Sequence, residues 1–154
     1  GRRGLIQKIT KYPVQLCQYH QQQIIRRYLP NRSKHPASKH LRLISNMLTE
    51  ITEEQFKDFL EQWLDTWKDY YDERSINLET GRSHYTHKRL RSAFKSLNNN
   101  QSYLFTYQKD PALLIPNTSN MIEGCFGNLK QLLGNHRRMN IETKMAMIDQ
   151  ILGV

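Results

Sequence analysis

Hydrophobic residues recur every three or four positions along most of this chain, which is the spacing of one face of an α-helix. The longest stripe runs along residues 52–71 and contains Phe56, Phe59, Leu60, Trp63, Leu64, Trp67, Tyr70 and Tyr71. Shorter stripes predict helices over residues 18–29, 39–48 and 86–97, one that begins near Asn120, and a last one capped by Asn140. The pattern therefore predicts a mainly α fold.

Polar and turn-forming residues mark the breaks between these helices. Thr52 is followed three residues later by Gln55, which predicts a capping box at the start of the long helix. Pro30 should end the first helix, and a basic, polar linker follows over residues 31–38. The polar run at residues 98–101 is expected to end the 86–97 helix.

Two smaller features complete the expected layout. A short strand is predicted over residues 14–17, and a loop is predicted around Gly81. In the first helix the spacing points Ile24, Ile25 and Tyr28 toward a core. The aromatic stripe of residues 52–71 is also expected to be core. The alternative, a platform on which nucleic-acid bases stack, is disfavoured because carboxylates on the same segment would repel phosphate.

Charge is divided unevenly along the chain. Residues 1–49 carry a formal charge of +10, residues 50–73 carry −7 and residues 74–154 carry +6, which gives +9 in total. Surfaces of opposite sign follow from this division, and the first and third parts suit a polyanion such as nucleic acid. The alternative is that these charges are ordinary solvated helix faces.

Length and composition set the broad class. At 154 residues the chain is long enough for one domain with its own core. Its two cysteines are far apart in sequence, so they do not indicate a disulfide framework. Neither a signal peptide nor an apolar run long enough to span a bilayer is seen. The expected location is cytoplasmic, or nucleoid-associated in a bacterium, with no membrane partner.

Residues 115–139, IPNTSNMIEGCFGNLKQLLGNHRRM, form a polar turn that leads into an amphipathic helix with a basic end. Glu123 falls in the first turn of that helix, and Gly124 and Gly127 beside it leave room for a ligand or a backbone. One interpretation is a capping box, in which Glu123 accepts the backbone N–H of Asn120. The other interpretation comes from a family resemblance.

The block PNTSNMIEGCFGNLKQLL, followed by HRRMN, resembles the region around the third carboxylate of insertion-sequence transposases of the DDE superfamily, related to the Mutator-like group. Two further blocks resemble the segment that follows the second catalytic Asp in that family. They are GRRGLIQKITKYPVQLCQYHQQQIIRRYL at residues 1–29 and GRSHYTHKRLRSAFKSL at residues 81–97. Together the three blocks span nearly the whole chain.

The resemblance implies an RNase H-like core on which two Asp and one Glu hold two Mg²⁺ or Mn²⁺ ions and cut and join DNA. Glu123 would be the third carboxylate, and the second Asp would precede Gly1, so the chain is expected to be an inactive fragment by itself. Residues 1–17 would be a remnant of the core, residues 18–102 a helical insertion, and residues 103–154 the C-terminal core segment. Transposon ends and target DNA would be the partners, and the family commonly works as dimers or larger assemblies.

Basic side chains on and beside the predicted helices are the candidates for DNA contact. They are Arg2, Arg3, Arg26, Arg27, Lys88, Arg89, Arg91, Lys95, Lys130, His136, Arg137 and Arg138. Those of the 86–97 helix cannot all point one way, so some should pack their stems over the core. The alternative for the last three is that they meet the negative end of the preceding helix dipole.

Two short pairs have the donor types of a zinc site. Cys17 and His20 form a Cys-x-x-His pair, and His84 and His87 form a His-x-x-His pair. If the fold brought the pairs together, they would supply the four ligands of a tetrahedral structural zinc. The alternative is a buried Cys beside a helix start and a polar loop before a basic helix.

The sequence therefore supports three hypotheses of different classes. The first is a DNA transposase fragment, and the second is a non-catalytic, basic helical module that binds nucleic acid, in which Glu123 is only a cap. The third is a protein-interaction bundle, which leaves the basic flanks without a role. Two Asp residues upstream would separate the first from the second, and salt-sensitive binding of duplex DNA would exclude the third.

Overall fold

The computed structural model describes residues 12–135 and 139–152 of the chain. This described part is mainly α with one small antiparallel hairpin, which confirms the mainly α class predicted from periodicity. The chain divides into two compact units, residues 1–118 and residues 119–154. The division into residues 1–17, 18–102 and 103–154 that the resemblance implies stays a prediction.

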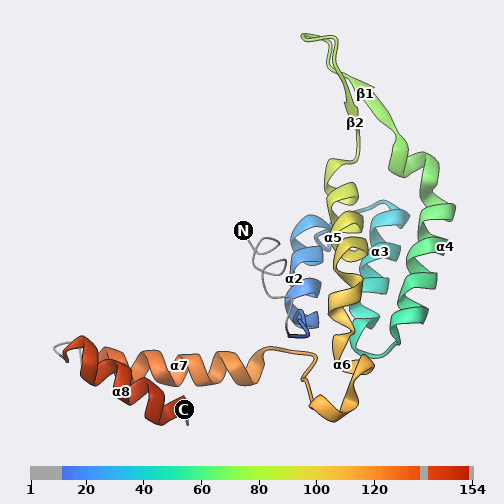
Figure 1. Cartoon of the computed structure of the whole chain (residues 1–154). Coiled ribbons are helices and arrows are strands. Elements are labelled where there is room, and N and C mark those ends of the chain that lie inside the picture. Colours follow the sequence, from blue (N-terminus) through green and yellow to red (C-terminus); the bar gives the residue numbers. More distant parts are fainter. Residues whose placement is uncertain (1–11, 136–138, 153–154) are drawn as a thin grey trace. The chain divides into compact units, whose positions relative to one another are not determined.

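Four helices of the first unit form an up-and-down bundle. They are α2 (Gln18–Tyr28), α3 (Pro36–Asn46), α4 (Glu53–Asp72) and α5 (Lys88–Leu104). Consecutive helices are antiparallel, and α5 returns to lie between α2 and α4 (Figure 1). The connection between α3 and α4 contains the 3₁₀ turn η1 (Met47–Thr49). We call these four helices the bundle.

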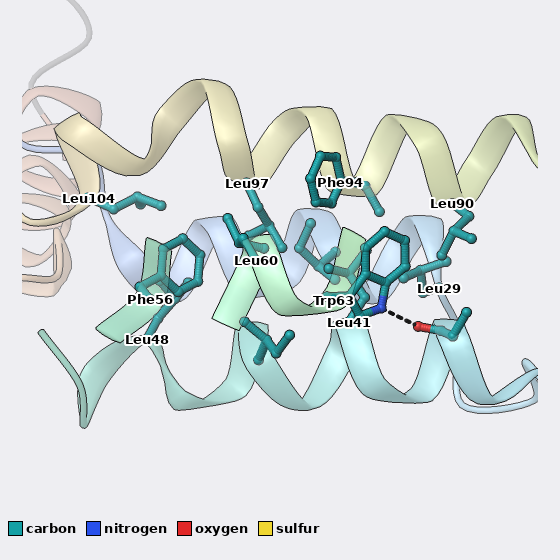
Figure 2. Packing of buried hydrophobic residues seen from close by; sticks show 14 of the residues in the cluster. Leu29, Leu41, Leu48, Phe56, Leu60, Trp63, Leu90, Phe94, Leu97 and Leu104 are labelled. Carbon is teal, nitrogen blue, oxygen red and sulfur yellow. Dashed lines mark hydrogen bonds between the residues drawn. The ribbon is translucent and has the colours of Figure 1, made fainter. Parts of the chain in front are cut away.

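The bundle encloses the hydrophobic core. Phe56, Leu60 and Trp63 of α4 are at most 2% exposed, and the aliphatic side chains of the other helices surround them (Figure 2). Leu41 of α3 and Leu97 of α5 are fully buried in the same cluster. The buried members of the aromatic stripe of residues 52–71 are therefore core, as their spacing predicted, and the other members, such as Phe59 and Trp67, are partly buried against that core.

The starts of α3 and α4 show how local sequence sets the helix boundaries. Thr52 Oγ1 accepts the Gln55 N–H at 3.3 Å and Gln55 Oε1 accepts the Thr52 N–H at 3.0 Å, which confirms the predicted capping box. Helix α3 begins at Pro36, earlier than predicted, because proline suits the first helical position. The ring of His35 caps it by accepting the Ala37 N–H at 3.2 Å.

A β-hairpin joins α4 to α5 and projects from the end of the bundle where α4 ends and α5 begins (Figure 1). Strand β1 (Arg74–Ile76) pairs antiparallel with β2 (Ser83–Tyr85). The loop between them contains Gly81, at a φ of +65°, and the Asn77 side chain accepts two backbone N–H groups of the loop. The predicted loop is confirmed, but the hairpin around it was not predicted, because three-residue strands are too short for alternation to show.

One further boundary prediction and one predicted element were wrong. Helix α5 continues through the polar run at residues 98–101 to Leu104, because Asn100 donates to Gln21 of α2 at 2.9 Å and so gains a tertiary partner. Residues 14–17 are not a strand. Their backbone is satisfied by the end of α5 instead, where the Leu16 N–H bonds to the carbonyl of Tyr103 at 2.7 Å.

After α5 the chain makes the short helix α6 (Thr106–Lys109) and the 3₁₀ turn η2 (Pro111–Leu113). The second unit consists of α7 (Asn120–Asn135) and α8 (Ile141–Leu152), which we call the helical pair. The starts of both helices were predicted correctly, and the Asn140 side chain accepts the Thr143 N–H at 2.8 Å. Met145 and Ile151 of α8 are exposed.

Candidate nucleic-acid interface

Polar side chains fix how α2 lies along α5. The buried side chain of Gln21 donates to Ser96 Oγ at 3.0 Å and accepts from Asn100 Nδ2 at 2.9 Å. One turn earlier, Gln18 Nε2 donates to the carbonyl of Leu104 at 3.0 Å. Because the two helices are antiparallel, this register places the last turn of α2 beside the first turn of α5 (Figure 1).

The register gathers basic side chains around two adjoining hollows. The larger hollow, of about 540 Å³, is lined in part by Arg27, Tyr28 and Arg89. The smaller, of about 410 Å³, is lined in part by Arg32 and Lys88, and again by Tyr28 and Arg89. We call these five residues the basic face. Since Tyr28 and Arg89 line both hollows, the basic face is one continuous surface of the bundle.

The electrostatics of the basic face are one-sided. Among the described residues, no Asp or Glu lines either hollow. Glu73 lies close to the smaller one, with its Oε2 2.7 Å from Nε2 of His87, so one negative charge stands beside the positive side chains. Four cationic side chains therefore act together on whatever enters the hollows, which favours an anionic ligand.

Arg91 was a candidate for DNA contact, but the structure uses it inside the fold. Its Nη1 donates to the carbonyl of Tyr71 at 2.7 Å and to Asp72 Oδ1 at 2.9 Å. The guanidinium also lies over the rings of Tyr71 and Tyr85, at 4.0 and 3.5 Å from their centroids. With its side chain only 12% exposed, Arg91 fastens α5 to the end of α4.

The remaining candidates are scattered. Arg26 and Lys95 are exposed in the bundle but line neither hollow, and Lys130 is exposed on α7 of the other unit. Five candidates lie outside the described residues: Arg2, Arg3, His136, Arg137 and Arg138. The structure thus brings together Arg27, Lys88 and Arg89 from the predicted set.

Stacked rings hold the start of α5 beside the end of α4. The Tyr70 ring centroid lies 3.6 Å from that of His35 and 3.6 Å from that of His87. Trp67 contacts the same His35 ring edge-on. Burial, and then the nearby charge of Glu73, raises the pKa of Tyr70 above its ordinary value. The position of Lys88 and Arg89 therefore depends on a packed aromatic support.

The structure does not bring together the four residues considered for zinc. Cys17 precedes α2, at the end of the bundle where Leu16 bonds to Tyr103 near the end of α5. His84 and His87 lie on β2 and directly before α5, so the 17 residues of that helix separate the two pairs. In the described part of the chain, no group of three or more His, Cys, Asp or Glu side chains is arranged to hold a metal.

Glu123 occupies the position that the sequence predicted, in the first turn of α7. Its N–H donates to the carbonyl of Ser119 at 2.8 Å, and its carboxylate accepts the Ser119 hydroxyl. A Cβ added at Gly124 or at Gly127 would meet no atom within 4 Å, so the surface beside Glu123 is open within this unit. The carboxylate is exposed and in contact with its own helix start.

The helical pair also carries an apolar hollow of about 390 Å³. Met121, Ile122, Phe126 and Leu129 of α7 line it together with Ile151 of α8. Of these, Ile122 is 54% exposed and Phe126 is 51% exposed, although they belong to the stripe that predicted the helix. The apolar side of α7 is therefore mostly uncovered within its own unit.

Sequence reasoning missed two residues of the basic face. Arg32 lies in the linker of residues 31–38, whose basic character was visible but was not tied to a site. Tyr28 was expected to face the core, but α2 ends there and the residue is 37% exposed.

Among the described residues, no helix combines the length and apolar character needed to cross a membrane.

Comparison of this chain with models of known protein families, with curated proteins and with solved structures finds no match.

Proposed function

We propose that the chain binds DNA through the basic face of the bundle. The observation that carries this proposal is the shared lining of the two hollows, which joins Arg27 of α2 to Lys88 and Arg89 of α5 without an intervening carboxylate. Phosphates along a nucleic-acid strand are regularly spaced anions, and a continuous basic surface releases their counterions when it binds. Tyr28 in the middle of this surface offers an aromatic ring to a sugar or base.

The acidic helix α4 makes the charge on the surface of the bundle asymmetric. Its carboxylates belong to the −7 segment of residues 50–73, and none of them lines the basic face. A polyanion is therefore attracted to α2 and α5 and repelled from the exposed side of α4. This asymmetry favours a bound orientation over nonspecific attraction by the net charge.

The test is the salt dependence of binding to a labelled duplex, followed by fluorescence anisotropy between about 50 and 200 mM salt. If the four cations of the basic face each neutralise one phosphate, log K should fall with log salt with a slope of about −3 to −4. Replacing Lys88 by Ala should reduce that slope by about one unit. The matched control is Lys68→Ala, which removes the same charge from an exposed position of α4 and should reduce the slope much less.

Equal slopes for the Lys88 and Lys68 variants would contradict the basic face as the DNA site. Arg27→Ala provides an independent check from the other helix, because Arg27 lines only the larger hollow. It should reduce the slope by about as much as Lys88→Ala.

The wider proposal is that this DNA-binding bundle belongs to a DDE transposase, with the helical pair as C-terminal helices of an RNase H-like core. Two features support it. Glu123 lies in the first turn of α7, beside the open surface at Gly124 and Gly127. The uncovered apolar side of α7 also suits a helix that packs against a further layer of structure.

The residues described here do not fit a two-metal site. Glu123 is the only carboxylate in the first turn of α7, and no metal-binding group of three or more side chains occurs in the described part of the chain. The proposal therefore requires that other residues complete the site, and the purified chain should not nick plasmid DNA in Mg²⁺ or Mn²⁺. Metal-dependent nicking by this chain, lost in Glu123→Gln, would show instead that it carries a complete catalytic centre.

A further inference from the structure

The smaller hollow of the basic face lies where two bundle helices begin. Ser38 lines it from the first turn of α3, and Lys88 and Arg89 line it from the first turn of α5. Arg32 reaches it from the loop that precedes α3. Helix starts present backbone N–H groups and the positive end of the helix dipole. The first-turn N–H groups of α3 already donate to His35, so the hollow combines the start of α5 with three cationic side chains.

Ser38 adds a hydroxyl donor to the hollow. The residue is only 8% exposed and lines the hollow from the first turn of α3. Its oxygen is not among the fully enclosed side-chain atoms that lack a partner, such as Ser45 Oγ. The Ser38 hydroxyl can therefore donate to an anion that enters the hollow.

The start of α5 also lacks its usual cap. His87 holds the N-cap position, but its side chain makes no cap hydrogen bond. Its ring is stacked on Tyr70 and its Nε2 is directed at Glu73 instead. The N–H groups of the first turn of a helix have no intrahelical acceptor, so an outside acceptor can take the place of the cap.

We propose that this hollow binds a single phosphate group. Arg32, Lys88 and Arg89 supply the positive charge, and the hydroxyl of Ser38 and the first-turn N–H groups of α5 supply neutral donors. A tetrahedral phosphate has enough acceptor oxygens to use both kinds of donor at once. The inference deepens the proposed DNA binding, on which it rests for the source of the phosphate, and the group is either a backbone diester or a terminal 5′-monoester.

The hollow itself is tested without DNA. Inorganic phosphate is titrated into the isotope-labelled chain at constant ionic strength set with chloride, and backbone amide shifts are followed by NMR. Saturable shifts are expected in the first turns of α3 and α5. Ser38→Ala should weaken phosphate binding about tenfold, because it removes a hydrogen bond to a charged group. Arg32→Ala should weaken it at least as much.

The chain offers matched controls for both variants. Ser45 lies in the same helix, and its buried hydroxyl has no partner among the described residues, but it does not line the hollow. Ser45→Ala should therefore leave phosphate binding unchanged. Lys34→Ala removes a charge from the linker that carries Arg32 without touching the hollow. Shifts no larger than those caused by chloride, or equal losses in Ser38→Ala and Ser45→Ala, would overturn the proposal.

Duplex DNA then identifies the source of the phosphate. Two duplexes of one sequence, with 5′-phosphate or 5′-hydroxyl ends, are compared by anisotropy. If the terminal monoester is the ligand, the 5′-hydroxyl duplex should bind more weakly and should not respond to Ser38→Ala. If a backbone diester is the ligand, both duplexes should lose affinity equally in that variant, and no loss with either duplex overturns the inference.

The two proposals fail separately. In one case duplex binding depends on Lys88 and Arg27 but is unaffected by Ser38→Ala, and the chain shows no phosphate-specific shifts. That result would leave the proposed function intact and would exclude the phosphate site. Phosphate shifts that depend on Ser38, in a chain that does not bind duplex DNA, would keep the site and remove the proposed function.

Discussion

The bundle and the helical pair are built from the same kind of amphipathic helix, yet only the bundle closes a core. Trp63 of α4 is fully buried, whereas Phe126 of α7 is 51% exposed. Within the described residues of 119–154, Leu129 is the only buried hydrophobic residue. In the bundle four apolar stripes meet around one core, whereas the described residues of the second unit form two helices, which contact each other.

The difference shows that periodicity predicts a helix without predicting what covers its apolar side. The stripes of α4 and α7 have similar spacing, and burial depends on how many partners a helix finds. Two antiparallel helices cannot enclose a hydrophobic core by themselves, so their stripe stays partly in water. The stability of the first unit should therefore depend on its stripe much more than that of the second.

The largest expected effect tests this contrast directly. Trp63→Ala should lower the free energy of unfolding by about 3–5 kcal/mol, because it removes a buried ring and leaves a cavity. It also removes the indole donor of the 3.0 Å bond to the Ala37 carbonyl. Denaturant unfolding followed by circular dichroism measures the change.

Phe126→Ala is the matched change in the helical pair. Since half of that ring is already exposed, the loss should be below about 1 kcal/mol. A loss as large as that of Trp63→Ala would break the comparison, because it would mean that the stripe of α7 is covered in the free protein.

A smaller effect concerns a charged residue that the bundle encloses. Arg91→Ala should cost about 1–3 kcal/mol, because it leaves the Tyr71 carbonyl and Asp72 without their guanidinium partner. Arg89→Ala, two residues away, should change the free energy of unfolding by no more than about 0.5 kcal/mol and should weaken DNA binding instead. Equal stability losses in the two variants would mean that Arg89 is also a structural residue.

These two arginines also show what the sequence could and could not predict. Periodicity located α2, α4, α5 and α7 and their apolar stripes, since helical spacing and caps such as Thr52 with Gln55 are local features. It could not separate Arg89 from Arg91. Which basic side chain faces a hollow depends on the register of α5 against α2 and on the contacts that α5 makes with the end of α4. Both are tertiary features.

The errors have the same origin. Helix α5 was expected to stop at a polar run, but Asn100 and Gln21 satisfy each other across two helices. The zinc hypothesis assumed that two short ligand pairs would meet, and the length of α5 separates them. Arg32 was overlooked because it lies in a linker, where the sequence has no periodicity to give it a direction. Local signals thus predicted the helices, while contacts between helices determined the candidate site.

The smallest expected effect is a pH dependence that comes from a tyrosine of the bundle. All eight tyrosines of the chain lie before residue 108, so the helical pair has none. Burial raises the pKa of Tyr71 above its ordinary value of 10.0, with Arg91 acting in the opposite direction and Asp72 adding to the rise. Above pH 10.0 the unfolded chain releases this proton before the folded chain does.

The stability that Tyr71 contributes through this shift is therefore complete below pH 10.0 and is lost as the pH rises through the folded value. Tyr71→Phe keeps the ring that contacts Trp63 and Phe94 but removes the ionisable hydroxyl. The difference in unfolding free energy between the two proteins should be constant near neutral pH, and the loss above pH 10.0 should be shallower in the variant. Parallel curves in that range would show that the burial of Tyr71 does not contribute to the alkaline sensitivity of the bundle.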